Sequence, residues 1–289
     1  MRRMGFLGPA GTHSEAAAKY LNNQLQQPYE LVACANIYTE IQAVEKGELD
    51  ACLVPVENSI EGSINITLDT LMASDELSIA RELIWGVHNS LMVKEPGVKI
   101  RKILSHAQPL SQCREYILNN YPEAQLEAVV STAAAAHQVA VSSVEDGLAA
   151  ICTRRAGELN KLHCIGDNIE DLANNCTRFY QLVRADRVQE LTQDIEQVDK
   201  TLLICQIDGK DAGRLCEVLL ELATRDVNMT RIESRPAKTG LGEYVFFLDV
   251  DIPKRQDMFE AALQGIRRKS MWLRNPGKFP VLLAANNRQ

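Results

Sequence analysis

Several short segments combine hydroxyl, amide and charged side chains with glycine or proline, a mixture suited to binding carboxylates or phosphates. In residues 8–15, Thr12 stands three positions before Glu15, the spacing of a capping box that opens a helix. Ser131 and Thr132 precede a run of alanines and predict a second helix start. Free backbone N–H groups at helix starts attract anions. Taken alone, each segment also fits an ordinary capped turn.

Polar side chains also follow two predicted strands. An apolar run over residues 51–56 ends in Glu57 and Asn58, and a second run over residues 102–105 ends in Ser105, with Gln112 on the helix that follows. Polar groups at the carboxyl ends of strands are typical of cleft sites in α/β proteins. The alternatives are that Asn58 satisfies backbone groups of its own loop and that Ser105 caps the next helix.

The last polar segment, residues 174–179, brings Asn175, Thr177, Arg178 and Phe179 together. The Arg178 guanidinium offers a fork for a carboxylate, either of a ligand or of a salt bridge within the loop. Four helix starts and one arginine, without a Ser/His/Asp arrangement, indicate binding of a small ligand with several carboxylates. The residues alone do not identify that ligand.

The elements that must position these side chains alternate between short β-rich runs and longer helical patterns up to about residue 185. This alternation predicts an α/β architecture. Residues 186–199 are polar and predict a linker. The pattern then restarts over 200–284 as βαββαβ, the ferredoxin-like order, with its last strand at 279–283.

Composition narrows the function classes. The chain has 289 residues, enough for about two domains, with 46% apolar and 24% charged residues and a net charge of −7. The negative charge argues against nucleic acid as a partner. No membrane span or signal peptide is recognisable. The eight cysteines form no C-x-x-C pair, so we expect reduced thiols, a cytoplasmic location, and neither a metal nor a cofactor.

Taken in order, the polar segments resemble the prephenate dehydratase family. The matching motifs are G-P-x-G-T-x-S-E, V-P-V-E-N-S-x-x-G, S-H-x-Q-x-x-x-Q-C, S-T-A-A-A and N-x-T-R-F, over residues 5 to about 183. The resemblance implies decarboxylating dehydration of prephenate to phenylpyruvate, on the route to L-phenylalanine, by a carbon–oxygen lyase. It also implies a catalytic region over 1–185 made of two α/β lobes, similar to type II periplasmic binding proteins, with the second lobe at about 80–175.

The resemblance assigns roles to the candidate residues. Thr177 matches the catalytic threonine and is expected to donate a proton to the departing hydroxyl. Asn58 and Glu57 complete the expected catalytic set, with Glu57 either orienting the neighbouring groups or acting as an acid that supports Thr177. The expected substrate-binding residues are Thr12, Ser105, Gln112, Ser131, Thr132, Asn175, Arg178 and Phe179. His13 and His88 are expected to be structural or peripheral.

Residues 200–284 resemble the regulatory ACT domain of the same family. Binding of L-phenylalanine between regulatory domains of neighbouring subunits is then expected, in a homodimer or homotetramer. The residues expected to bind it are Gly213, Leu215, Asn228, Glu233, Ser234, Arg235 and Pro236. Two departures are an arginine at position 214, where the family usually has alanine, and an apparent insertion over 273–280. Because the chain starts at the first motif, we expect a monofunctional enzyme.

Two other functions remain open at this point. An arogenate dehydratase would bind an amino group where prephenate has a ketone. A metabolite sensor with the same two lobes would bind an anion without transforming it.

Overall fold

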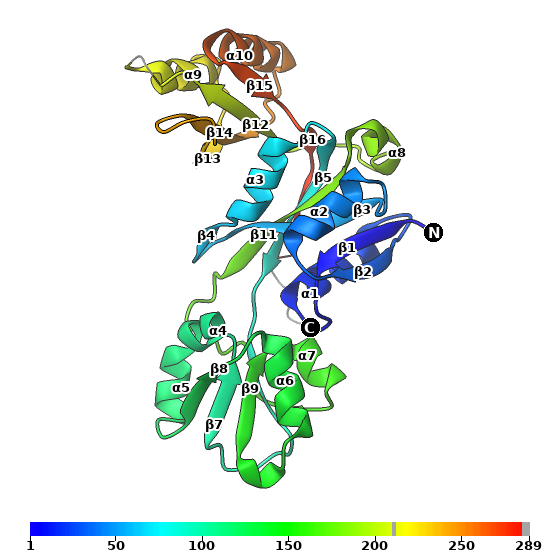
Figure 1. The fold of residues 1–289 in the computed structure, drawn as a ribbon, viewed down its shortest axis with the longest axis vertical. Coiled ribbons are helices and arrows are strands. Elements are labelled where there is room, and N and C mark those ends of the chain that lie inside the picture. Colours follow the sequence, from blue (N-terminus) through cyan, green and yellow to red (C-terminus); the bar gives the residue numbers. More distant parts are fainter. Residues whose placement is uncertain (210–211, 285–289) are drawn as a thin grey trace.

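We describe the fold from a computed structural model, for residues 1–209 and 212–284. Figure 1 shows three units stacked along the long axis of the molecule, with the C-terminal domain at one end, the first lobe in the middle and the second lobe at the other end. The first and second lobes are joined by two connections, at residues 87–89 and 167–175. Both lobes are mixed α/β units, as the sequence predicts.

The first lobe is a mixed sheet with helices on both faces. Its elements are β1 (Arg3–Leu7), α1 (His13–Gln24), β2 (Glu30–Cys34), α2 (Ile37–Glu45), β3 (Ala51–Asn58), β4 (Gly62–Ser63), α3 (Asn65–Ala73), β5 (Leu77–Gly86), β11 (Cys176–Arg184), η2 (Ala185–Arg187), α8 (Val188–Leu191) and β17 (Val281–Ala284). The strand order is β17-β5-β11-β3-β1-β2, with β4 paired to the end of β3. Strands β1, β2 and β3 are parallel, whereas β11 is antiparallel to both β3 and β5.

The second lobe is a smaller α/β unit. Its elements are β6 (Ser90–Val93), β7 (Lys102–Ser105), α4 (Ala107–Gln112), α5 (Arg114–Asn120), β8 (Gln125–Ala128), α6 (Thr132–Val141), η1 (Val144–Asp146), β9 (Leu148–Cys152), α7 (Arg154–Leu159) and β10 (His163–Gly166). The strand order is β10-β6-β9-β7-β8. Because β5 completes the first sheet, this lobe begins after residue 86, later than the predicted start at about 80.

The C-terminal domain has the predicted βαββαβ order. Its elements are β12 (Lys200–Ile207), α9 (Arg214–Ala223), β13 (Met229–Pro236), β14 (Tyr244–Asp251), α10 (Gln256–Lys269), β15 (Trp272–Arg274) and β16 (Lys278–Phe279). The antiparallel order β13-β14-β12-β15 is that of a ferredoxin-like sheet. Helix α10 buries Phe259, Leu263 and Ile266, spaced three and four residues apart, against one face of this sheet.

The end of the chain differs from the prediction. The strand expected at 279–283 to complete the C-terminal sheet lies mainly in the first lobe, where β17 pairs in parallel with β5, and β15 completes the C-terminal sheet instead. The apparent insertion at 273–280 is the crossover between the two units. Gly277 has a φ of 134°, and a Cβ there would lie 2.9 Å from the Ile79 carbonyl oxygen, so the crossover requires glycine.

The predicted linker also packs against the first lobe. Helix α8 lies within it, and Leu191 is buried among first-lobe residues. The segment is polar in sequence, but it is anchored to the first lobe and is not a flexible linker.

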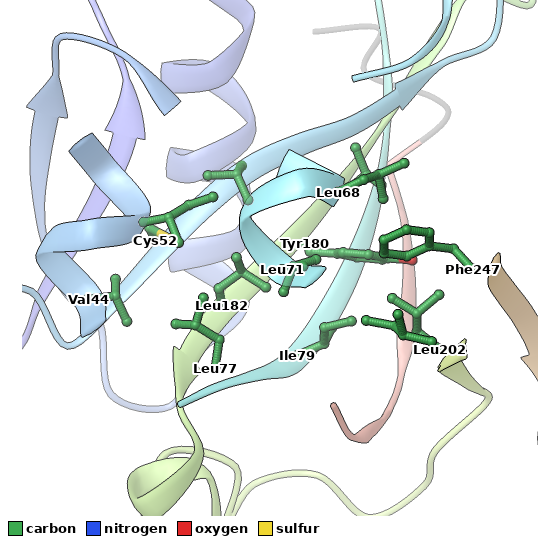
Figure 2. Packing of buried hydrophobic residues seen from close by; sticks show 14 of the residues in the cluster. Val44, Cys52, Leu68, Leu71, Leu77, Ile79, Tyr180, Leu182, Leu202 and Phe247 are labelled. Atoms are coloured by element: carbon green, nitrogen blue, oxygen red, sulfur yellow. The ribbon is translucent and has the colours of Figure 1, made fainter. Parts of the chain in front are cut away.

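One hydrophobic cluster joins the first lobe to the C-terminal domain. Figure 2 shows Leu68, Ile79 and Tyr180 of the first lobe packed with Leu202 and Phe247 of the C-terminal domain. All five side chains are fully buried. The C-terminal domain therefore shares part of its core with the first lobe.

Candidate active site

A cleft of about 470 Å³ lies between the two lobes. Side chains at the ends of β3 and β11 line it from the first lobe, and residues around α4 and α6 line it from the second lobe. The predicted residues that line it are Thr12, Asn58, Gln112, Ser131, Thr132, Thr177 and Phe179. Segments more than 100 residues apart in the sequence thus converge on one cavity.

At the first-lobe wall, Thr177 and Asn58 form a fixed pair. The two residues are direct partners in the β3–β11 register. The Asn58 side-chain oxygen accepts hydrogen bonds from the backbone N–H groups of Ile60 and Glu61, at 3.0 and 3.1 Å. The amide nitrogen therefore faces Thr177 and donates to its hydroxyl oxygen at 3.1 Å. Since the Thr177 oxygen accepts this bond, its own hydrogen remains available to a ligand.

A chain of amides continues from this pair to the second lobe. Asn58 donates to the side-chain oxygen of Asn175 at 3.0 Å, and Asn175 donates to that of Gln112 at 3.1 Å. The remaining Gln112 nitrogen is buried and has no hydrogen-bond partner among the described residues. A buried donor without a partner is costly, and Gln112 lines the cleft, so a bound ligand can supply the missing acceptor.

Two helix starts face the cleft, as the sequence predicts. The Thr12 hydroxyl accepts a bond from the Glu15 N–H at 3.3 Å and caps α1. The Ser131 hydroxyl accepts a bond from the Ala134 N–H at 3.0 Å and caps α6, where Thr132 is the first helical residue. Each helix therefore directs the positive end of its dipole toward the cavity.

The two lobes also touch directly beside the cleft. Thr153 of the second lobe donates to the Gly11 carbonyl oxygen at 2.7 Å. Gly11 has a φ of 87°, and a Cβ there would lie 3.1 Å from the side chain of Ala156. Only glycine meets both the backbone and the packing requirement, which explains the glycine of the first motif.

Arg178 and Glu57 lie outside the cleft. Side chains alternate across a strand, so Thr177 and Phe179 face the cavity while Arg178 points toward the C-terminal domain. Its guanidinium forms ion pairs with Glu57 and Asp249 at 2.8 Å and with Glu82 at 2.7 Å. The structure gives no support for Arg178 as a clamp on substrate carboxylates. Arg178 instead forms salt bridges with protein carboxylates, as in the alternative to ligand binding.

We call Glu57, Glu82, Arg178, Arg231 and Asp249 the ionic junction. Arg231 and Asp249 belong to the C-terminal domain, and Arg231 lies 3.2 Å from Glu57. Burial alone disfavours the charge on Arg178, but Tyr180, Asp249 and Glu82 outweigh this effect and raise the pKa of Arg178. The junction is thus a fixed charged contact between the first lobe and the C-terminal domain.

Two further substrate-binding predictions need revision. Ser105 is fully buried and donates to the Ile151 carbonyl oxygen at 2.6 Å, which joins β7 to β9. It neither lines the cleft nor caps α4, since His106 occupies that cap. Asn175 is 2% exposed and acts through its amide bonds to Asn58 and Gln112.

The residues predicted to bind phenylalanine occupy different faces of the C-terminal domain. On β13, Glu233 and Arg235 contact Ser63 and Asp69 of the first lobe, whereas Ser234 and Pro236 alternate with them and are exposed. Asn228 donates to Asp251 at 2.7 Å. Gly213 and Leu215 lie at the start of α9. A single described chain therefore does not bring all seven residues into one site.

Several cleft residues were missed from the sequence. Asn89, His106 and Gln108 line the cavity from the second lobe and its connection, and Glu61 and Ser63 line it from the first lobe. His106 directly follows β7, so it could have been predicted from its place at the carboxyl end of a strand, where cleft residues of α/β proteins are typically found. Among the described residues that line the cleft, none is a lysine or an arginine.

His13 also lines the cleft and is uncharged near neutral pH. Burial, helped by the nearby His88, lowers the pKa of His13 to about 4. The cavity therefore offers hydroxyls, amides, the neutral His13 imidazole and backbone N–H groups to an anion, and Glu61 is the one acidic side chain among its described lining residues. No group of three or more His, Cys, Asp or Glu residues suited to a metal is found in the described part of the chain. Over the same ranges, no helix has the length and apolar character needed to span a bilayer.

Comparisons with known proteins agree with the motifs. The family model "Prephenate dehydratase" matches residues 4–187. Prephenate dehydratase of Methanocaldococcus jannaschii is 34% identical over 94% of this chain and 96% of its own length. Prephenate dehydratase of Amycolatopsis methanolica is 36% identical over 96% of this chain and 88% of its own length.

Solved structures show the same similarity in three dimensions. The crystal structure of prephenate dehydratase from Arthrobacter aurescens, in complex with L-Phe, matches with a TM-score of 0.81 and 32% identity. The match covers 96% of this chain and 89% of that one. The likeness therefore extends over both lobes and the C-terminal domain.

Proposed function

The chain belongs to the prephenate dehydratase family, and from this membership we propose that its cleft converts prephenate to phenylpyruvate as a carbon–oxygen lyase. The relatives support this reading over an arogenate dehydratase or a sensor without activity. The observation that carries the proposal is the hydrogen bond from Asn58 to Thr177 at the wall of the cleft.

The reaction removes carbon dioxide and the ring hydroxyl of prephenate together. The electron pair of the bond to the ring carboxylate moves into the ring, the carbon–oxygen bond at the opposite ring position breaks, and the ring becomes aromatic. The departing hydroxide needs a proton, and Thr177 supplies it. As this proton leaves, negative charge develops on the Thr177 oxygen, and the Asn58 amide stabilises that charge.

A cleft without lysine or arginine among its described lining residues suits a carboxylate that must be lost. A carboxylate held by an arginine would be stabilised as an anion, and this would raise the barrier to its departure. The starts of α1 and α6 instead offer backbone N–H groups and helix dipoles, which position the dianion without an ion pair. Arg178, held in the ionic junction, is not available to oppose decarboxylation.

Gln112 and Asn175 extend the site to the second lobe. The free Gln112 nitrogen can donate to an oxygen of the substrate, while its oxygen stays bonded to Asn175. Because Asn175 also bonds to Asn58, the catalytic pair and the second-lobe contact share one network of amides. Phe179, 2% exposed, supplies an apolar wall for the ring.

A direct assay tests this function. The purified chain is incubated with prephenate, and phenylpyruvate is followed by its ultraviolet absorbance in alkali. We expect turnover well above the spontaneous rate, and faster turnover of prephenate than of arogenate. An absence of turnover, or a preference for arogenate, would reject the proposed substrate.

The C-terminal domain is proposed to be a regulatory ACT domain with L-phenylalanine as its effector. Its support is the βαββαβ order and the match over the whole chain to a relative crystallised with L-Phe. The candidate residues are divided between the start of α9, Asn228 and the two faces of β13, so a complete site would need the C-terminal domain of a second subunit. Calorimetric titration with L-phenylalanine, together with light scattering for subunit number, tests this. Heat of binding, inhibition and a dimer or tetramer are expected, and a monomer without heat would contradict it.

A further inference from the structure

We propose that Arg231, which belongs to the C-terminal domain, is a positioning residue for the catalytic pair Asn58 and Thr177. The proposal rests on the proposed function, since it concerns the reaction at that site. Arg231 does not reach the cleft itself. It acts through the turn at residues 59–63 and through Glu57, both of which adjoin Asn58 in the chain.

The Arg231 guanidinium contacts both units at once. Its side chain is 11% exposed, and Nε lies 3.2 Å from Glu57. Nη2 donates to the Ser63 hydroxyl at 2.5 Å and to Glu233 at 3.2 Å. Nη1 lies 3.8 Å from Asp249. Two of these partners, Glu57 and Ser63, belong to the first lobe and flank the turn that follows Asn58.

Ser63 is the direct link to the cleft. It lines the cavity, and its hydroxyl also donates to Glu233 at 2.6 Å. In the short β3–β4 pairing, Ser63 is opposite Glu57 and Gly62 is opposite Asn58. Arg231 thus holds both members of one of these pairs, and this keeps β4 against the end of β3.

The closed turn sets the orientation of the Asn58 amide. The backbone N–H groups of Ile60 and Glu61 lie within this turn and bind the Asn58 side-chain oxygen. If the turn opened, the amide would lose the contacts that fix it and could rotate. Its oxygen would then face Thr177 and would accept the hydrogen that the reaction needs.

A second connection runs through Glu57. Arg231 and Arg178 share the same Glu57 oxygen, at 3.2 and 2.8 Å. In the strand register Arg178 is opposite Glu57, and Thr177 is opposite Asn58. The carboxylate between the two arginines therefore fixes the backbone of both strands one residue away from the catalytic pair.

The shape of arginine is essential to this role. A guanidinium reaches Glu57, Ser63 and Glu233 in fixed directions, whereas a lysine ammonium is one compact charge that cannot keep all three. Arg231→Lys should therefore recover only part of what Arg231→Gln loses.

The test compares Arg231→Gln with Arg225→Gln. Arg225 also belongs to the C-terminal domain and pairs with Glu221 at 2.6 Å, within that domain. We expect Arg231→Gln to lower kcat by about ten- to a hundredfold with a smaller change in KM, because small misplacement of reacting groups has effects of this size. Arg225→Gln should keep the wild-type kcat, and Arg231→Lys should be intermediate.

Two measurements separate positioning from a general loss of structure. In an Asn58→Ala background, Arg231→Gln should cause little further loss of kcat, because the group it orients is already gone. Hydrogen exchange of the amides at 59–64 should become faster in Arg231→Gln and not in Arg225→Gln. Equal kcat losses in the two glutamine variants, or a full additional loss in the Asn58→Ala background, would overturn the proposal.

Failure of the proposed function has a different signature. Wild-type protein without prephenate turnover would reject that function, and the exchange comparison would then decide whether Arg231 holds the turn. Unchanged exchange at 59–64 in Arg231→Gln would overturn the positioning role, whatever the wild-type activity is.

Discussion

The cleft and the ionic junction lie on opposite faces of the same strands but use opposite chemistry. The cleft is lined mainly by hydroxyls, amides and the neutral His13 imidazole, with a single acidic side chain, Glu61, and no lysine or arginine among its described residues. The junction packs two arginines against three carboxylates, with Glu82 and Asp249 at most 1% exposed. One residue step along β11, from Thr177 to Arg178, separates the two environments. A charged side chain within a catalytic motif can therefore serve the architecture while neutral neighbours carry the chemistry.

The largest effect should come from removing the hydroxyl in the cleft. Thr177→Ala should lower kcat by about 10²–10⁴-fold, the usual contribution of a positioned acid. The apparent affinity for prephenate should change far less, since other groups hold the carboxylates. Steady-state kinetics with alkaline detection of phenylpyruvate measures both. Thr177→Ser, which keeps the hydroxyl, is the matched control and should retain much more activity. A near-normal kcat in Thr177→Ala would remove the donor role.

The next largest effect should come from placing a negative charge beside Thr177 in the cleft. Asn58→Asp replaces the amide donor by a carboxylate, which repels the dianion and no longer stabilises charge on Thr177. We expect kcat to fall by about 10²–10³-fold, as for the loss of one preorganised donor, together with a higher KM. The same assay run against Asn58→Gln, which keeps an amide, isolates the charge. An Asn58→Asp variant as active as wild type would contradict the arrangement described for this pair.

Disruption of the junction should affect stability before it affects binding. Arg178→Gln removes from the buried Glu82 and Asp249 the cation that lies nearest to both, and breaking a buried ion pair typically costs about 3–5 kcal/mol in the free energy of unfolding. Because Arg178 lies outside the cleft, KM for prephenate should change by less than about threefold. Denaturant titration and kinetics of the same preparation test both statements.

Arg187→Gln is a suitable control for this variant, since Arg187 pairs with the partly exposed Asp50 and Glu190. It should lose about 1 kcal/mol or less, as surface pairs do. A large rise in KM with unchanged stability in Arg178→Gln would show that Arg178 binds a substrate carboxylate, and the contrast between the cleft and the ionic junction would then be wrong.

The smallest effect concerns the pH dependence of stability at the cleft wall. The pKa of His13 falls from about 6.5 in the unfolded chain to about 4 in the fold. The unfolded state therefore binds more protons between these values, so the His13 contribution is complete above about pH 6.5 and is lost as the pH falls toward 4. We expect His13→Asn to reduce the stability difference between pH 7 and pH 4.5 by about 1–3 kcal/mol. Equal pH dependence in both proteins would show that His13 titrates normally.

Much of the fold was predictable from the sequence. Strand β7 has the predicted bounds because a short β-rich run is bounded by turns, and the capped starts of α1 and α6 follow from Thr12 and Ser131. The path after β15 was not predictable, because β17 pairs with a strand about 200 residues earlier, a long-range contact without a local signal.

The site was predicted in part for a similar reason. Positions at strand ends and helix starts predicted a cleft site for Asn58, Thr12 and Ser131, and the family resemblance added Thr177; the structure brings all four to one cavity. Arg178 was misassigned because its motif suggests a ligand, while the alternation of side chains along β11 directs it away from the cavity. Ser105 was misassigned because its buried bond to Ile151 depends on the partner strand. Arg231 has no motif, and its significance lies only in contacts between domains.

The most direct test of the account is a crystal structure of Thr177→Ala with prephenate bound. We expect the ring hydroxyl to face position 177 and the carboxylates to lie at the starts of α1 and α6, with Gln112 bonded to the substrate and Arg178 still paired with Glu82 and Asp249. A substrate carboxylate bound to Arg178, or a substrate bound away from the cleft, would contradict it.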